Sequence, residues 1–352
     1  MKLNQIRLLH LIKSLDVGGI ERSTINYSNH LVEEFGSVSI YASPGFYSDN
    51  RYINKKIPHI EPKNSIKLNP VAFLNNFIQL IKFIRINQIN VINYHHRIFL
   101  PYSFLIGILF PRLKIIYTAH SVYNDQLNRF LFAHEFIAVS ESVKKDLAIS
   151  GKNKVTVIKH GTAIQYKGKK EDCSKQRTIG FIGRLVKEKQ PIKLLETFRK
   201  YSFTDNDFRL VFVGEGPLEN EIRKRISKYR LEEKVCLIKP LIDLNGIYGK
   251  IDILVYPSFS LEGFGLVIIE AQSFGIPVIS FDNNSVREII TDGKNGILVR
   301  DGDFDKLLTS AELTLKDKSR YKELSDNAIR NVKDNFSLEN TVDMNKQFFA
   351  SL

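Results

Sequence analysis

Two carboxylates on either side of a glycine turn, Glu262 and Glu270, are the side chains of this chain best placed for chemistry. The apolar run before them, residues 251–256, predicts a buried strand, and Gly275 with Pro277 predicts the end of a helix after them. Glu262 should therefore lie on a strand-to-helix loop, and Glu270 about two turns into the helix. At roughly 1.5 Å rise per residue, the two carboxylates should lie on the order of 10 Å apart.

The turn between the two glutamates is Gly263-Phe264-Gly265, at the start of the predicted helix. Free backbone N–H groups and the helix dipole favour an anion at such a position. An anion site between two separated carboxylates fits a long ligand held end to end, such as a sugar joined through a diphosphate to a nucleoside. We therefore interpret Gly263, Phe264 and Gly265 as part of a ligand-binding loop.

A second turn combines a glycine with cations. Gly183 and Arg184 follow an apolar run at residues 178–182, and Lys189 precedes a helix predicted to begin near Pro191. Arginine offers a rigid fork of five donors and lysine a point charge, and both suit a diphosphate. The alternative is a surface turn whose cations are simply solvated.

Three further glycines lie at predicted strand-to-helix turns. Gly18 and Gly19 follow the first predicted strand and open a helix with free N–H groups, where a plain loop is the alternative. Gly214 belongs to a Gly-x-Gly turn, which by itself is a weak sign of a phosphate loop and is also explained by a tight turn. We interpret Gly214 as a wall of a nucleotide site.

Histidines follow two predicted strands in the first half of the chain. His120 comes just after the strand at residues 114–118, in the loop region where a ligand should bind, and this favours a ligand contact over a purely structural role. His95 and His96 occupy an equivalent loop, but as sequence neighbours they need a third ligand to hold a metal. No His-Glu-x-x-His pattern occurs, so no metal site is expected.

Alternating strands and helices must position these residues. Apolar runs predict strands at residues 6–12, 38–41, 91–94, 114–118, 136–139, 155–158, 178–182, 209–213, 235–238, 251–256, 278–281 and 297–299. Helices are predicted at residues 19–33, 71–87, 141–149, 191–200, 217–229 and 265–274. This alternation predicts parallel sheets covered by helices, with ligands at the carboxyl ends of the strands.

A composition change divides the predicted elements into two series. Residues 161–176 are rich in lysine and poor in apolar side chains, which indicates a linker. We therefore predict an N-terminal domain at 1–165, a C-terminal domain at 166–335, and a closing helix at 336–352 that returns to the first domain. Both domains should be doubly wound α/β units that face each other across a cleft.

Composition narrows the class of protein and of partner. Hydrophobic residues make up 43% and charged residues 25% of the 352 residues, as in globular proteins. The two cysteines, Cys173 and Cys236, form no disulfide or zinc pattern, which favours a reducing compartment. The net charge of +13 suits nucleic acid, an anionic membrane or anionic small substrates, and no nucleic-acid-binding motif occurs.

One basic segment is a candidate for membrane contact. Residues 51–67 carry five lysines or arginines, and the apolar stretch 98–110, too short to span a bilayer, lies nearby in sequence. Together they are a candidate surface for anionic lipid, while solubility is the alternative role of the lysines. Residues 1–15 fit a first strand better than a signal peptide. We expect a cytoplasmic protein, with attachment to the inner face of the cytoplasmic membrane left open.

These residues resemble a known family. The stretch from Glu262 to Glu270 is similar to the E-x7-E motif of glycosyltransferase family 4, retaining enzymes of the GT-B fold. Gly183, Arg184 and Lys189 resemble the phosphate clamp of that family, and Gly18-Gly19 its N-terminal glycine loop. His120 falls where the family has a histidine that contacts the donor sugar, and residues 336–339 look like the start of its closing helix. The resemblance covers nearly the whole chain.

The resemblance implies a metal-independent glycosyltransferase without a cofactor. It would move a hexose-type sugar from a nucleoside-diphosphate sugar to a glycan or lipid-linked acceptor, in synthesis of capsule, O-antigen or lipopolysaccharide. Arg184 and Lys189 would stabilise the leaving diphosphate. Glu270 would accept hydrogen bonds from the ribose. Glu262, with the amides of residues 263–265, would hold the sugar hydroxyls, and His120 would contact the sugar.

Retention of configuration usually involves two carboxylates about 5 Å apart. The larger separation expected for Glu262 and Glu270 argues against that arrangement. It favours a front-face route, in which the acceptor attacks from the side of the leaving group and passes its proton to the phosphate.

Departures from the family pattern leave the sugar and nucleobase open. Residues 160–163 read His-Gly-Thr-Ala where the family often has Asn-Gly followed by Asp, Gln190 replaces a frequent glycine, and Pro240-Leu241 stands where glycine is common. Two other functions stay open: a nucleotide-sugar epimerase of the same architecture, and a non-catalytic module that binds sugar nucleotides or nucleic acid. A nicotinamide dehydrogenase is disfavoured because no complete Gly-x-Gly-x-x-Gly opens either domain.

Overall fold

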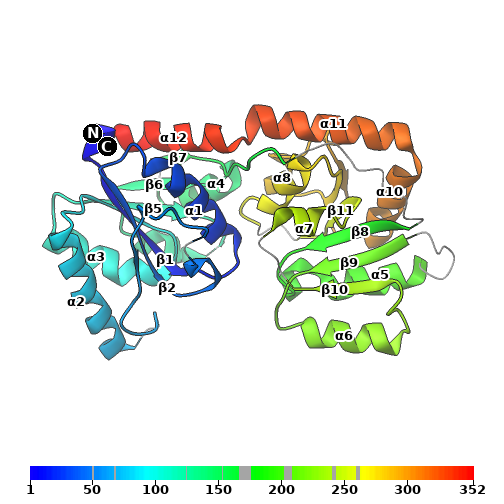
Figure 1. Ribbon diagram of the computed structural model, residues 1–352, viewed down its shortest axis with the longest axis horizontal. Helices are drawn as coiled ribbons and strands as arrows, with labels where there is room; N and C mark the ends of the chain where they lie inside the picture. The colour runs from blue at the N-terminus through cyan, green and yellow to red at the C-terminus, as the bar shows by residue number, and fades with distance from the viewer. Residues whose placement is uncertain are drawn as a thin grey trace. The chain divides into compact units, whose positions relative to one another are not determined.

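The computed structural model describes residues 1–49, 51–66, 69–123, 125–152, 154–165, 176–201, 208–239, 243–258 and 262–352. The chain forms two compact units, one of residues 1–160 with 338–352 and the other of residues 161–337 (Figure 1). The predicted boundary after residue 165 falls five residues later than this division. It adjoins residues 166–175 of the expected linker, which lie outside the described residues.

The first unit is built on a parallel sheet of seven strands in the order β3-β2-β1-β4-β5-β6-β7. Its strands are β1 (Arg7–Ser14), β2 (Ser37–Ser43), β3 (His59–Ile60), β4 (Val91–Tyr94), β5 (Lys114–Ala119), β6 (Glu135–Ala138) and β7 (Val155–Val157). The helices are α1 (Gly19–Leu31), α2 (Pro70–Ile86), α3 (Leu100–Leu109), α4 (Glu141–Ile149) and α12 (Leu338–Ala350). Strand order reverses between β1 and β4, and in such sheets ligands bind beside the carboxyl ends at this point.

Both ends of the described chain lie in this unit. Helix α12 packs against α1, and the ring of Phe349 lies edge-on to that of Phe35, with centroids 5.5 Å apart. The Met1 ammonium group donates a hydrogen bond to the Ala350 carbonyl at 2.5 Å. Helix α12 is therefore part of the same unit as β1, although the whole second unit lies between them in sequence (Figure 1).

The second unit has a parallel six-stranded sheet in the order β10-β9-β8-β11-β12-β13. The strands are β8 (Arg177–Ile182), β9 (Phe208–Val213), β10 (Val235–Ile238), β11 (Ile253–Tyr256), β12 (Val278–Phe281) and β13 (Ile297–Val299). The helices are α5 (Pro191–Tyr201), α6 (Glu219–Lys228), α7 (Leu244–Tyr248), α8 (Leu266–Ser273), α9 (Asn284–Arg287), α10 (Phe304–Lys316) and α11 (Lys318–Asn335). Order reverses between β8 and β11, the two strands that precede the candidate loops.

The predicted fold class is confirmed: each unit is a doubly wound parallel sheet. Strands that are buried along their length, such as β4 and β12, were predicted to the residue because a sheet covered on both faces requires a continuous apolar run. The short strand β3 and helices α7, α9, α10 and α11 were not predicted.

Helix α3 was expected only as an apolar stretch broken by Pro101 and Gly107. Proline lies in its first turn, where no helical hydrogen bond is lost. Gly107 is needed for packing, because an added Cβ would overlap the Phe132 ring. Among the described residues no helix has the length and apolar content needed to cross a membrane.

Candidate active site

The predicted glycine turn opens α8 in the second unit. Gly265, the residue before the helix, has φ of +104°, a backbone conformation that strongly favours glycine. The Phe264 side chain is buried, and its ring lies 5.8 Å from that of Phe336. Phe264 therefore anchors the turn, and only its backbone remains for the ligand contact that the sequence suggested.

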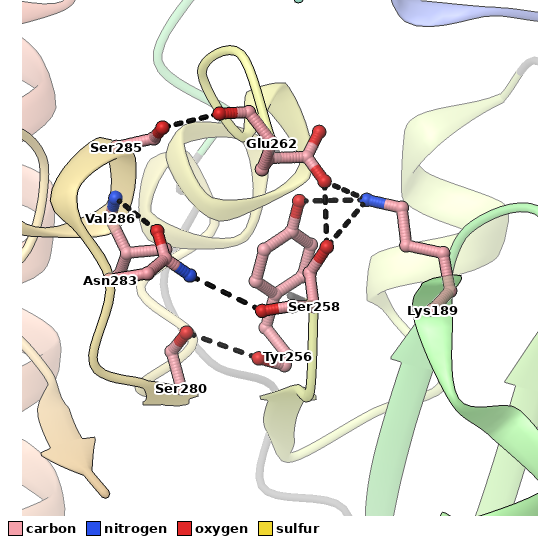
Figure 2. Close-up of polar contacts among 8 residues, drawn as sticks. All are labelled: Lys189, Tyr256, Ser258, Glu262, Ser280, Asn283, Ser285 and Val286. Atoms are coloured by element: carbon pink, nitrogen blue, oxygen red, sulfur yellow. Dashed lines mark hydrogen bonds and ion pairs between the residues drawn. The ribbon is translucent and has the colours of Figure 1, made fainter. Parts of the chain in front are cut away.

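Glu262 and Lys189, which are 73 residues apart in sequence, form an ion pair beside this turn (Figure 2). The Lys189 Nζ also donates to the hydroxyl oxygens of Tyr256 at 3.0 Å and Ser258 at 3.1 Å. Ser258 Oγ donates to Glu262 Oε2 at 2.8 Å. The three hydrogens of the ammonium group thus have three acceptors, supplied by the end of β11 and the head of α8.

The pair is only partly screened by solvent. The side chains of Lys189 and Glu262 are 21% and 22% exposed. Burial alone would raise the pKa of Glu262, but the charge and hydrogen bond of Lys189, with hydrogen bonds from Ser258 and Tyr256, outweigh it and hold the pKa below its usual value. Burial first, and then the charge of Glu262, raise the pKa of Tyr256, so this phenol stays neutral. The loop therefore holds one cation and one anion at neutral pH.

Residues after β12 support the loop from behind (Figure 2). Asn283 caps α9 by accepting from the Val286 N–H at 3.1 Å, and its amide donates to the Ser258 carbonyl at 3.2 Å. Ser285 Oγ donates to the Glu262 carbonyl. Sequence reasoning missed these residues, although their place just beyond a strand's carboxyl end was a usable signal.

Glu270 lies on α8 and is 2% exposed. The Tyr248 hydroxyl donates to its Oε2 at 2.7 Å, and the Tyr248 ring stacks on Phe274 with centroids 5.0 Å apart. The carboxylate is thus held in place from α7. Tyr248 was not among the predicted site residues.

Of the two glycines at the ends of β8 and β9, Gly214 is explained by packing. A Cβ on Gly214 would overlap the Gly183 carbonyl oxygen, so Gly214 allows the ends of β8 and β9 to approach closely. Arg184 is exposed just past β8. Gln190, at the position where the family often has glycine, has φ of +52°. It therefore adopts the left-handed conformation that a glycine would take there without strain. Pro240-Leu241, the other departure noted above, lies outside the described residues.

The remaining predicted residues lie in the first unit. Gly18 precedes α1 in an extended conformation, and Gly19 opens this helix. His120 follows β5 and is 9% exposed. Its Nε2 lies 2.9 Å from His95 Nδ1, and its Nδ1 lies 3.4 Å from His160 Nε2.

His120 belongs to a row of four buried rings, which we call the histidine chain: His10, His95, His120 and His160. The row runs along the carboxyl edge of the first sheet and ends at Ser23 of α1. Burial lowers the pKa of His10 to about 3 and that of His160 to about 4. Burial, followed by the neighbouring histidines, lowers the pKa of His95 and His120 well below the usual value. The four rings are therefore neutral at physiological pH.

Two family models match the chain and together span most of it. Residues 17–166 match "Glycosyltransferase Family 4" and residues 164–331 match "Glycosyl transferases group 1". With the two parallel-sheet units and the loop described above, this defines the class: the chain belongs to the family 4-type glycosyltransferases of the GT-B fold.

Proteins similar in sequence to this chain include enzymes of surface-polysaccharide synthesis, and proteins similar in structure include one crystallised with UDP and glucose. The capsular polysaccharide biosynthesis glycosyltransferase CapM of Staphylococcus aureus is 29% identical over 222 residues, 58% of each chain. The lipopolysaccharide core biosynthesis mannosyltransferase LpsB of Rhizobium meliloti is 24% identical over 258 residues, 68% of this chain and 73% of LpsB. HepE of Anabaena, in complex with UDP and glucose, superposes with a TM-score of 0.85 at 18% identity, over 99% of this chain and 100% of HepE, and shows the fold alone.

The ion pair can be tested by a double-mutant cycle on Lys189→Met and Glu262→Gln. Each single substitution leaves a partly buried group without its partner, so we expect a coupling energy of about 1 kcal/mol or more in the free energy of unfolding from urea titrations. The exposed pair Lys316–Glu312 on α10 is the matched control, with an expected coupling of about 0.3–0.5 kcal/mol. A coupling no larger than that of the control would contradict the pairing.

The histidine chain makes a second prediction, on pH. Because each pKa is lower in the folded state than the unfolded value of 6.5, the unfolded state binds more protons below that value. Stability should be complete above pH 6.5 and fall as the pH approaches 4, by about 1.4 kcal/mol per pH unit for each histidine. Urea midpoints between pH 7.5 and 5 measure this slope. His10→Gln should reduce it, whereas His30→Gln, at an exposed position of α1, should not.

Proposed function

We propose that this glycosyltransferase moves a hexose-type sugar from a nucleoside-diphosphate sugar to a glycan or lipid-linked acceptor, with retention, in the synthesis of a cell-surface polysaccharide. The observation that carries the proposal is the Lys189–Glu262 pair beside the glycine turn that opens α8. CapM and LpsB, named for capsule and lipopolysaccharide synthesis, support the pathway class. HepE, crystallised with UDP and glucose, supports the kind of donor.

In this proposal, donor binding exchanges one anion for another. In the structure, the Lys189 ammonium group donates a hydrogen bond to the Glu262 carboxylate. The diphosphate of a donor would replace Glu262 as the partner of Lys189. Once Lys189 turns to the phosphate, Glu262 is free to accept a hydrogen bond from a sugar hydroxyl. Arg184, exposed beside the same turn, adds a second cation. The turn at residues 263–265, which precedes α8, would bring a helix N-terminus to the same anion.

Glu270 takes the role of ribose acceptor. One of its carboxylate oxygens accepts from Tyr248, and an ionised carboxylate has capacity for further hydrogen bonds. His120, together with Gly18 and Gly19, would meet the ligand at the carboxyl edge of the first sheet.

The chemistry depends on stabilising the departing diphosphate. The bond from the anomeric carbon to the diphosphate oxygen breaks, the acceptor oxygen bonds to that carbon on the same face, and the acceptor proton passes to a phosphate oxygen. Negative charge grows on the leaving group, where cations and amides already fixed in place are most effective. Glu262 is paired with Lys189, and Glu270 accepts a hydrogen bond from Tyr248, so both carboxylates have binding partners. This favours the front-face route over one in which a carboxylate attacks the sugar to form a covalent intermediate.

The donor site can be tested with nucleoside diphosphates and their sugars in a thermal-shift panel. One of these ligands should raise the melting temperature, because a ligand at 100 times its Kd adds about 2.7 kcal/mol. Glu270→Gln keeps an acceptor for Tyr248 but lacks the charge, and should weaken binding by at least about tenfold. Glu312→Gln on α10 is the control and should bind as the parent does.

Two outcomes would contradict the proposal. No ligand of the panel shifts the melting temperature, or Glu270→Gln transfers sugar at the parental rate. An assay of the donor without acceptor distinguishes an epimerase, which converts the donor alone.

We further propose that the first unit contacts anionic lipid, through a surface that shares the apolar stretch 98–110 with the one expected and includes α2. In the basic segment, Lys56 pairs with Glu33 and Arg51 with Asp49, while Lys67 lies outside the described residues. A set of exposed apolar side chains lies on α2, on α3 and in the 3-10 turn at Gln126–Phe130, which follows β5. Its exposed side chains, the α2–α3 surface, are Val71, Leu74, Ile78, Ile86, Phe104, Ile108, Leu109, Leu127 and Phe130.

Charge complementarity selects a membrane as the partner of the α2–α3 surface. Residues 62–124 contain seven lysines or arginines and no aspartate or glutamate. Lys82 and Arg85 are exposed on α2, and the Arg85 guanidinium lies 5.6 Å from the Phe110 ring. The helices touch through Phe73 and Tyr102, whose ring centroids are 4.4 Å apart (Figure 1). Apolar side chains with cations at their border suit insertion between anionic headgroups.

Co-sedimentation with vesicles tests this surface. The protein should bind vesicles that contain phosphatidylglycerol and leave vesicles of phosphatidylcholine alone in solution. Phe104→Glu with Ile108→Glu should weaken binding by at least about tenfold, because two exposed apolar side chains that would insert into the membrane are replaced by charges. Leu313→Glu, at an exposed leucine of α10, is the control. Equal binding of the double variant and the control would refute the α2–α3 surface.

A further inference from the structure

The histidine chain can carry its hydrogens in only two ordered ways. His10 Nδ1 lies 3.0 Å from His95 Nε2, and the same Nδ1-to-Nε2 contact recurs at 2.9 and 3.4 Å along the row. A neutral imidazole has one N–H and one lone pair. A hydrogen bond at every junction therefore requires all four rings to carry hydrogen on Nδ1, or all four on Nε2.

The His10 end of the row distinguishes these arrangements. His10 is fully buried, and its Nε2 has no hydrogen-bond partner among the residues that the structure describes. If the rings carried hydrogen on Nε2, this atom would be a buried donor without an acceptor, which is rare in proteins. If they carry it on Nδ1, the same atom is only an unused lone pair. At the other end, His160 Nδ1 lies 2.6 Å from the Ser23 hydroxyl oxygen, which can accept a hydrogen bond in the Nδ1–H arrangement and donate one in the other, so this end is compatible with both.

We propose that His10 and His95 are positioning residues that hold His120 as the neutral Nδ1–H tautomer. The hydrogen bond from His95 fills the Nε2 lone pair of His120, so the ring keeps its hydrogen on the other nitrogen. His120 then meets a ligand as a donor, and the group that it recognises must be an acceptor oxygen, such as that of a sugar hydroxyl. This recognition rests on the proposed function, whereas the tautomer does not.

Exposure and distances along the histidine chain indicate where a ligand would bind. His120 and His160 are 9% and 8% exposed, whereas His10 and His95 are 0% and 2% exposed. A ligand would therefore contact the histidine chain at His120 and His160. The contact between His120 and His160, at 3.4 Å, is the longest of the row. A ligand oxygen can therefore take over the His120 hydrogen at the smallest loss. Because hydrogen bonds in series polarise one another, the donors behind His120 strengthen the one that it offers.

Histidine tautomers can be read directly by NMR. In the full-length protein labelled with ¹⁵N-histidine, long-range ¹H–¹⁵N correlation spectra at pH 7 should show Nδ1 of His120 protonated and Nε2 unprotonated. His95→Leu removes the donor to Nε2 and should release His120 into a mixture of both tautomers. His95→Asn, which can place an amide donor near the former Nδ1, should restore the single form. His30→Gln, which changes a residue that is not part of the histidine chain, should leave the spectrum of His120 unchanged.

Activity supplies a second measurement. If His120 contacts the donor sugar, His95→Leu should lower kcat/KM for transfer by about tenfold, the value of one hydrogen bond, and His95→Asn should recover most of it. Binding of the nucleoside diphosphate alone should not change, because the residues proposed to hold it lie in the second unit.

Three results would overturn the proposal: His120 protonated on Nε2 in the parent protein, His120 present as imidazolium at pH 7, or a His120 tautomer that His95→Leu does not alter. The NMR measurement needs no substrate. Failure of the proposed function would therefore appear as loss of the kinetic effect with the spectra intact. Should His95→Leu fail to fold, the parent spectrum and His95→Asn still decide the question.

Discussion

The ammonium group of Lys189 is the charge around which the loops of the second unit are arranged. A partly buried cation is stable only where acceptors surround it, and here Tyr256, Ser258 and Glu262 supply them. The glycine turn must bring the head of α8 close enough for Glu262 to reach, and Asn283 holds Ser258 from behind. These contacts join the segments that follow β8, β11 and β12 around a single charge.

In both units, polar side chains lie at the carboxyl ends of the parallel strands, but the two sets differ in charge. In the second unit the carboxyl edge carries the ion pair of Lys189 and Glu262, each about one-fifth exposed. Burial would raise the pKa of Glu262, but the charge and hydrogen bond of Lys189 outweigh burial and lower it. In the first unit the edge is filled by neutral imidazoles, because four rings with so little solvent cannot carry charge. The edge in the second unit therefore offers charges, and the edge in the first unit offers neutral donors and acceptors.

Much of the fold could be predicted from the sequence, and less of the site. Buried parallel strands are mostly apolar, here with Asn93 in β4 and Ser280 in β12 as exceptions, so both strands could be predicted as apolar runs. Helix α10 has its apolar residues at helical spacing as well, and could have been predicted by the same reasoning. Contacts between distant residues could not. Lys189 meets Glu262 because β8 pairs with β11, with Ile179 opposite Ile253, and no local pattern states that register.

The histidine chain shows the same limit. His10 lies in an apolar run that predicts only a strand, while His95 and His120 were each noticed as single residues at strand ends. Their connection follows from the strand order β1-β4-β5, which places three strand ends side by side. The final helix adds a consequence for biosynthesis. Since α12 packs against α1, the second unit is an insertion between the two segments of the first. A ribosome therefore completes the second unit before it makes α12, and until that helix is made, the face of α1 that it covers stays open to water.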